Sequence, residues 1–212
     1  MMLKWLGDYS FVLEVAGKTV VIDPCSGDES EYPVADVIII TQWHFAHCNV
    51  GFVRKCMGDE TIVLGTEEVA SQIFPCSTFK TGDSRRVDDI EIFCMPVNNP
   101  RPGIKPGSKP SAQFGFVLHA EGKKHYFIGD SDFVEGMQDV LPDTLIIPVG
   151  GTVTLNPKQA ADTARLISPK VAVPVMWGGF VGSKDDADYF AELCRDADVD
   201  VLVPELGSVL PL

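Results

Sequence analysis

Residues 36–57 constrain the fold of this chain most strongly. Residues 37–40 form an unbroken run of β-branched side chains, which indicates a strand buried on both faces, as in a sheet covered by helices. A turn rich in aromatic and imidazole side chains follows, and apolar residues then recur at helical spacing over 50–57. His44 and His47 therefore lie at the carboxyl end of a core strand, where α/β sheets place their ligands.

The charge balance limits the partners of this protein. The 212 residues include 30 acids and 17 basic residues, giving a formal net charge of −13, which repels nucleic acid and anionic membranes. The sequence shows no apolar stretch near about 18 residues and no signal peptide, because an acid and a glycine lie within the first ten positions. We therefore expect a cytoplasmic protein that binds neither nucleic acid nor membrane.

The order of predicted elements indicates one α/β domain over residues 1–212. Short β-rich runs separated by turns predict an antiparallel meander at the start, and strands alternate with helices in the last third. We expect strands at 3–6, 11–15, 19–22, 37–40, 61–64, 90–95, 114–120, 124–128, 145–149, 171–175 and 199–203, and helices at 50–57, 66–73, 157–167 and 185–194. Two sheets in one domain, with helices outside, follow from this pattern.

Several motifs carry a family resemblance. T-Q-W-H-F-A-H at 41–47 resembles the T-H-x-H-x-D-H signature of the metallo-β-lactamase superfamily, and W-L-G-D-Y-S-F at 5–11 resembles the W-L-G-H-x-S-F opening of its ascorbate-6-phosphate-lactonase-like, metal-dependent hydrolase members. Further similar fragments follow in family order: P-V-N-N at 96–99, G-D-S at 129–131, P-V-G-G at 148–151 and P-V-M-W-G at 174–178. The resemblance implies a four-layer αββα sandwich of two mixed sheets, with a two-metal site at the sheet edges.

The implied metal site departs from the family pattern at four positions. Mapped through the resemblance, the altered ligand positions are Gln42, Ala46, Asn99 and Met176. His44 and His47 stand, one for each metal, and Asp130 stands between the two metals. Neutral amides and a thioether are poor substitutes for the imidazole and carboxylate ligands that zinc prefers. We therefore expect a degenerate site that has stopped holding two metals.

Three functional hypotheses stay open. The leading one is a non-catalytic or metal-free member of the fold, a pseudoenzyme that binds a small ligand or partner. The second is a hydrolase of phosphorylated or lactone-like molecules, with His44, His47 and Asp130 as catalytic residues and ligands of one weakly bound zinc, manganese or iron. The third is a structural subunit of an oligomer; the sequence does not set the oligomeric state, and a homo-oligomer is one option.

A ligand pocket is expected beside these residues. Its predicted lining residues are Asp8, Trp43, Trp177, Arg101 and Lys105. The two tryptophans could fill the volume that metals occupy in relatives, and Gln42 and Asn99 could hydrogen-bond His44 and Asp130. The two cations lie in a proline-rich loop at 98–110 and could receive a small anion, although an ordinary solvated loop has the same composition. If the mapping is correct, Asp130 must lie within about 10 Å of His47.

Overall fold

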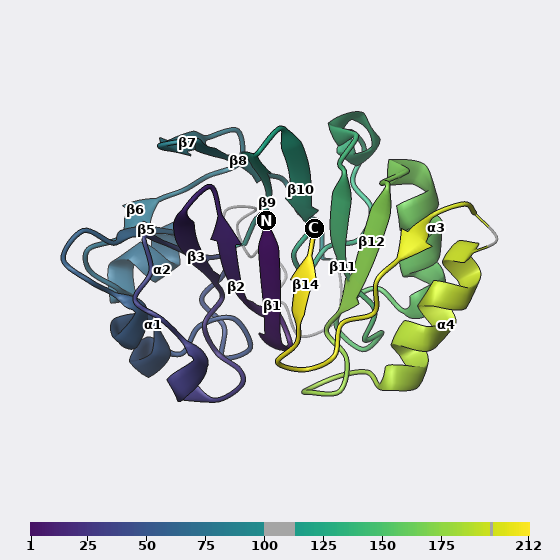
Figure 1. Ribbon diagram of the computed structural model, residues 1–212, viewed down its shortest axis with the longest axis horizontal. Helices are drawn as coiled ribbons and strands as arrows, with labels where there is room; N and C mark the ends of the chain where they lie inside the picture. The colour runs from purple at the N-terminus through teal and green to yellow at the C-terminus, as the bar shows by residue number, and fades with distance from the viewer. Residues whose placement is uncertain (100–112, 196) are drawn as a thin grey trace.

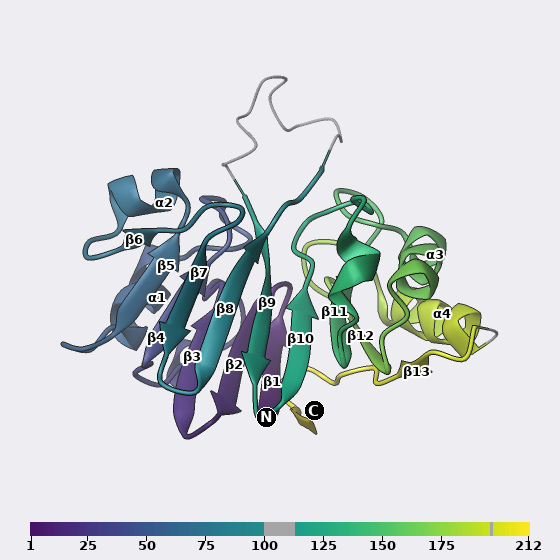
Figure 2. The ribbon, with the colours of Figure 1, turned by 90° about the horizontal axis from the view of Figure 1, so that it is seen from above.

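The computed structural model describes residues 1–99, 113–195 and 197–212, and folds the chain into two facing sheets (Figures 1 and 2). The first sheet has seven strands in the order β14-β1-β2-β3-β4-β5-β6, and the second has seven in the order β13-β12-β11-β10-β9-β8-β7. The first sheet comprises β1 (Met2–Gly7), β2 (Ser10–Val15), β3 (Lys18–Ile22), β4 (Val37–Ile40), β5 (Ile62–Gly65), β6 (Ser77–Thr78) and β14 (Val209–Pro211).

The second sheet and the helices complete the chain. Its strands are β7 (Ser84–Val87), β8 (Ile90–Met95), β9 (Gly115–Ala120), β10 (Lys123–Phe127), β11 (Thr144–Pro148), β12 (Val171–Val175) and β13 (Asp200–Val201). The helices are α1 (Val50–Cys56), α2 (Glu67–Gln72), α3 (Pro157–Ile167) and α4 (Lys184–Arg195). Figure 1 shows α1 and α2 at one side of the molecule and α3 and α4 at the other.

Both sheets are mixed, as expected. Strands β1 to β3 pair antiparallel, whereas β3, β4, β5 and β6 run parallel. In the second sheet β7 to β10 pair antiparallel, and β10 to β13 run parallel. The parallel halves align the carboxyl ends of their strands, which places the loops that follow β3, β4, β10 and β12 at the same edge of the sandwich.

Three apolar clusters correspond to the three interfaces of a four-layer sandwich. The largest lies between the sheets and draws on both, with Phe11, Phe116 and Phe127 among its fully buried members. A second joins α3 and α4 to the outer face of the second sheet, and a third joins α1 and α2 to the first sheet. The αββα architecture is therefore confirmed. All ten core side chains expected from the strand pattern are buried: Trp5, Val12, Val20, Ile38, Ile39, Val63, Phe116, Ile128, Ile146 and Val173.

The element boundaries differ from expectation mainly at the sheet margins. The helix predicted at 157–167 is α3, where Asn156 forms a capping box with Gln159 and Pro157 occupies the first turn. The strand predicted at 199–203 shortens to Asp200–Val201, and the edge strands β6, β7 and β14 were not expected. No helix in the described ranges is long and apolar enough to cross a lipid bilayer.

Candidate functional site

The predicted histidine turn lies at the shared edge of the parallel strands. It leaves β4 after Thr41, and the backbone N–H groups of His47 and Cys48 both donate to the His44 carbonyl, at 2.9 Å each. Asn49 then caps α1 through its side chain. This tight turn directs His47 into the protein, where it is fully buried, and leaves His44 exposed at the surface.

His47 is held between two carboxylates. Its Nδ1 lies 2.7 Å from Asp23 Oδ2, and its Nε2 lies 3.1 Å from Asp130 Oδ2. Asp23 follows β3 and also accepts hydrogen bonds from Thr41, at 2.6 Å from the backbone N–H and 2.5 Å from the hydroxyl. The predicted proximity of His47 and Asp130 is therefore confirmed, and three strand ends meet at one imidazole.

The two carboxylates determine the protonation of His47. Burial by itself would lower the pKa of this imidazole, but Asp130 and Asp23 raise its pKa to about 10. Burial would also raise the pKa of Asp130, yet His47 and a hydrogen bond from Gln42 hold that pKa below its ordinary value. His47 is thus an imidazolium at neutral pH, and a metal at its Nε2 would have to displace a proton and break the bond to Asp130.

Asp130 follows β10 at the centre of the site. Gln42 donates from Nε2 to Asp130 Oδ2 at 2.9 Å, as the closed-network hypothesis expected. Because an ionised carboxylate accepts but cannot donate, this contact fixes the Gln42 amide with its N–H toward Asp130. The other oxygen, Oδ1, is buried without a hydrogen-bond partner in the described part of the chain.

His44 is near the pair but separate from it. Its ring centroid lies 6.2 Å from that of His47 and 4.3 Å from that of Phe45. Partial burial and the neighbouring His47 lower the pKa of His44, against a smaller opposing effect of Asp130. His44 is therefore a neutral imidazole beside a cationic one at neutral pH.

The other altered ligand positions are occupied by contacts within the protein. Met176 is 2% exposed and belongs to the core between the sheets, and Ala46 is also buried. Asn99 donates from its side chain to the Val153 carbonyl at 3.1 Å, a partner different from the expected His44 and Asp130. Met176 is thus a core side chain, and Asn99 secures the loop that follows β11.

Asp8 has an unexpected structural role. Its side chain accepts hydrogen bonds from the Ser26 hydroxyl and, at 3.1 Å, from the Phe180 N–H, while its carbonyl accepts from the Met176 N–H at 3.3 Å. Asp8 and Met176 both have positive φ, at 44° and 59°. Two of the positions that depart from the family motifs therefore contact each other and join the β1–β2 turn to the loop after β12.

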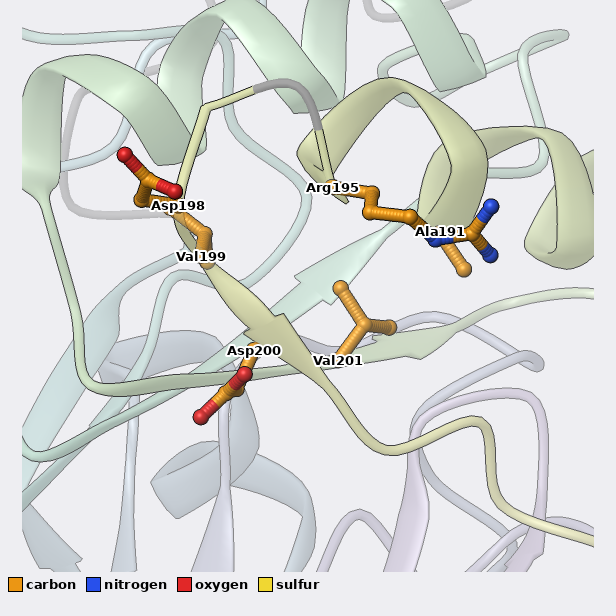
Figure 3. A pocket seen from close by; sticks show the side chains of 6 residues that line it. All are labelled: Ala191, Arg195, Asp198, Val199, Asp200 and Val201. Carbon is orange, nitrogen blue, oxygen red and sulfur yellow. The ribbon is translucent and has the colours of Figure 1, made fainter.

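The predicted pocket residues are distributed over different surroundings. Trp177 packs at 4.8 Å from Trp5 and lines a hollow of about 340 Å³ together with Asp8. Trp43 packs against the apolar cluster beneath α1 and α2, so the expectation that it fills a metal's volume finds no support in these contacts. Arg101 and Lys105 lie outside the described residues. A second hollow, of about 460 Å³, lies between α4 and β13 beside Arg195, at an edge of the second sheet, whereas β4 belongs to the first sheet (Figure 3).

The residues present do not fit a dinuclear metal centre. No group of three or more His, Cys, Asp or Glu side chains in the described ranges is arranged to hold a metal ion. Gln42 presents an amide N–H to Asp130, Ala46 has no donor atom, and Met176 is in the core. Each metal of the implied pair would retain one imidazole and a share of Asp130, fewer ligands than a catalytic zinc requires.

Two residues of the site were missed by sequence reasoning. Asp23 directly follows an apolar strand, which was a usable signal, because β3 and β4 run parallel and bring Asp23 beside the histidine turn. Tyr9 is fully buried, accepts a hydrogen bond from the Gly129 N–H at 2.6 Å, and lies 5.6 Å from the His47 ring. It supports the Gly129–Asp130 turn from the opposite sheet, a contact that no local pattern encodes.

Comparisons with known proteins agree with this fold. The profile of the Beta-lactamase superfamily domain matches residues 2–176. The chain is 26% identical to a UPF0173 metal-dependent hydrolase of Caldivirga maquilingensis over 99% of this chain and 97% of that protein, and 30% identical to one of Aeropyrum pernix over 95% and 94%. Among solved structures, the metallo hydrolase Igni18 of Ignicoccus hospitalis superposes with a TM-score of 0.81 at 21% identity, covering 99% of this chain and 97% of that one. The chain belongs to the β-lactamase superfamily, in its metal-dependent hydrolase family.

Proposed function

We propose that this protein is a metal-independent member of the metal-dependent hydrolase family, whose sheet-edge site binds a small molecule without hydrolysing it through a two-metal centre. One observation carries the proposal: Asp130, the carboxylate that the resemblance places between both metals, is bonded through one oxygen to both His47 Nε2 and Gln42 Nε2. A cationic imidazole and an amide N–H thus supply the positive charge that metals supply in the motif. The family name describes relatives and leaves this chain's own activity open.

The arrangement is stable without a metal for a physical reason. A buried carboxylate needs a charged or hydrogen-bonding partner. The fully buried His47 imidazolium is such a partner for two carboxylates at once, Asp23 and Asp130. Truncating one member would leave a buried charge without compensation. His47 and Asp130, which would otherwise coordinate metal, therefore form an ion pair that the hydrogen bond from Gln42 supports.

A hydrolysis assay tests the proposal. Wild-type protein is incubated with p-nitrophenyl esters and phosphodiesters, with and without added zinc, manganese or iron. We expect no metal-dependent turnover above that of a heat-denatured control. Turnover that requires metal, and that Asp130→Asn and His47→Gln both abolish while the fold persists by circular dichroism, would contradict the proposal.

A mononuclear hydrolase is the second candidate, and Asp130 Oδ1 favours it. This buried oxygen lacks a partner in the described ranges and is a remaining acceptor for a single cation, with His44 at the surface nearby. Calorimetric titration with manganese or zinc separates the two functions. One tight equivalent that disappears in Asp130→Asn would favour the mononuclear hydrolase. Binding of a small anion, which depends on Arg101 and Lys105, stays a prediction. The role as a structural subunit of an oligomer also stays a prediction.

A further inference from the structure

The hollow lined by Asp8 and Trp177, distinct from the His47–Asp130 pair, lies between the β1–β2 turn and the loop after β12. It has a volume of about 340 Å³, within the range of small-ligand pockets, and its described lining includes Trp5, Trp177 and Phe180. Its wall adjoins the histidine turn, because the Cys25 thiol donates to the Ala46 carbonyl at 2.9 Å. This pocket does not depend on whether the sheet-edge site binds metal.

Aromatic side chains form much of this pocket. The Trp5 and Trp177 rings lie 4.8 Å apart at 43° and make a tilted wall. Phe180 is 57% exposed at the rim and meets Phe45 edge-to-face at 5.0 Å. Large aromatic faces close to solvent attract cations through the negative potential above each ring.

A single acid, Asp8, supplies charge to the described lining, which has no Lys, Arg or His. Asp8 is 4% exposed, and its side chain accepts hydrogen bonds from two neutral groups, the Ser26 hydroxyl and the Phe180 N–H. Each carboxylate oxygen accepts one of these bonds and keeps further acceptor capacity. The carboxylate is thus fixed in orientation and has no cationic partner among the described residues.

The backbone of Gly179, in the loop after β12, lies directly against the Asp8 carboxylate. A Cβ at Gly179 would lie 2.4 Å from Asp8 Oδ1, so no other residue fits there without moving the carboxylate. The Trp5 indole also donates to the Asp8 carbonyl at 3.0 Å. The Gly179 backbone and the Trp5 indole together fix Asp8 in the wall of the pocket.

We propose that this pocket binds a small organic cation, an ammonium or quaternary ammonium group, with Asp8 as its counter-ion and the Trp177 and Phe180 rings as its aromatic wall. A buried carboxylate without a cation is costly, and a desolvated ammonium between aromatic faces and a carboxylate offsets that cost. The same lining disfavours phosphate and carboxylate ligands, because it offers them no cation.

The test uses choline and its uncharged carbon analogue, 3,3-dimethylbutan-1-ol, titrated into the full-length protein and followed by tryptophan fluorescence and calorimetry. Choline binds saturably at one site, and the neutral analogue of the same shape binds at least about tenfold more weakly, because it lacks the cation. Equal affinities of the wild-type protein for choline and for the neutral analogue, or no saturable binding of choline, would overturn the proposal.

Two variants and one control localise the binding. Asp8→Asn removes the charge and lowers choline affinity at least about tenfold. Leu206→Arg places a cation at the rim from a side chain that is 68% exposed, so it blocks the pocket without disturbing the core, and remains informative if Asp8→Asn does not fold. Glu67→Gln removes one exposed charge on α2 and leaves affinity unchanged. The assignment to this pocket would be overturned if Leu206→Arg left choline affinity unchanged. It would also be overturned if Glu67→Gln lowered choline affinity as much as Asp8→Asn does.

Discussion

Asp23 illustrates how individual residues determine the chemistry of this site. It lies on the far side of His47 from Asp130, bonds Nδ1, and thereby directs Nε2 toward Asp130. In metal sites such a carboxylate orients a histidine ligand. Here the same orientation produces a buried imidazolium flanked by two acids.

Removing Asp23 should destabilise the protein strongly. Asp23→Ala leaves the buried His47 with one counter-ion and deprives Thr41 of its acceptor, so we expect a loss of about 3–5 kcal/mol in the free energy of unfolding. Urea unfolding measures it. Asp89→Ala, an exposed acid on the β7–β8 turn, is the matched control and should change stability by less than about 0.5 kcal/mol. Equal effects of the two substitutions would contradict the proposed network.

His125 should control part of the acid sensitivity. It is buried on β10 and its Nδ1 has no hydrogen-bond partner within the described ranges. Burial, with the N-terminus and Lys123, lowers its pKa to about 4 from the ordinary 6.5. The folded state lowers the pKa of His125, so below about pH 6.5 the unfolded chain binds a proton that the folded protein does not. The free energy of unfolding is therefore unaffected by His125 above about pH 6.5 and falls progressively as the pH decreases toward about 4.

The variant His125→Leu isolates this effect. Between pH 6.5 and pH 4 the wild type should lose about 3 kcal/mol more than the variant, corresponding to the shift in the pKa of one group. Urea unfolding of both proteins at several pH values measures the difference, and the carboxylates common to both cancel. Parallel stability curves would show that His125 does not titrate in this way.

At the scale of elements, the helix boundaries are set by local chemistry. Asn156 accepts from the Gln159 N–H at 2.9 Å, and Gln159 accepts in return from the Asn156 N–H at 3.1 Å. Thr66 caps α2 in the same manner, with its hydroxyl accepting from the Val69 N–H. These signals act within four residues, so the sequence predicts α3 at its observed boundaries.

Removing the α3 cap should have a measurable cost. Asn156→Ala leaves the Gln159 N–H without its side-chain acceptor and should lower the free energy of unfolding by about 1 kcal/mol. Lys158→Ala, exposed in the same turn, is the control and should change it little. Both are compared by urea denaturation, and a cap variant as stable as the control would show that packing alone holds α3.

Strand predictions succeeded where burial or alternation is strong and failed at the edges. The β4 run is buried along its whole length and was placed correctly, as was β12. Strands β6 and β14 have only two and three residues, too few to show a period, and β7 reads Ser-Arg-Arg-Val with three exposed side chains. They form because a neighbouring strand supplies the hydrogen bonds, and that neighbour is known only from the assembled sheet.

At the scale of the whole molecule, the sequence motifs identified the residues of the site but not the hydrogen bonds that join them to distant segments of the chain. His44, His47 and Asp130 follow strand ends, so their convergence follows from the parallel topology. The Asp8 contact with the loop after Met176, the Tyr9 contact with Gly129, and the association of Asn99 with Val153 join segments far apart in sequence. These are hydrogen bonds between loops that only the assembled sheets bring together, and no pattern of residues along the chain records them.

Elemental analysis of untagged protein purified without chelators shows whether the sheet-edge site holds metal, and so tests the proposed metal independence. We expect far less than one zinc, iron or manganese per chain after dialysis, because His47 and Gln42 already occupy Asp130 Oδ2. The same measurement on Asp130→Asn provides a baseline for adventitious metal, and both proteins should match. One or more tightly held metal ions per wild-type chain, lost in Asp130→Asn, would contradict the proposed metal-independent function.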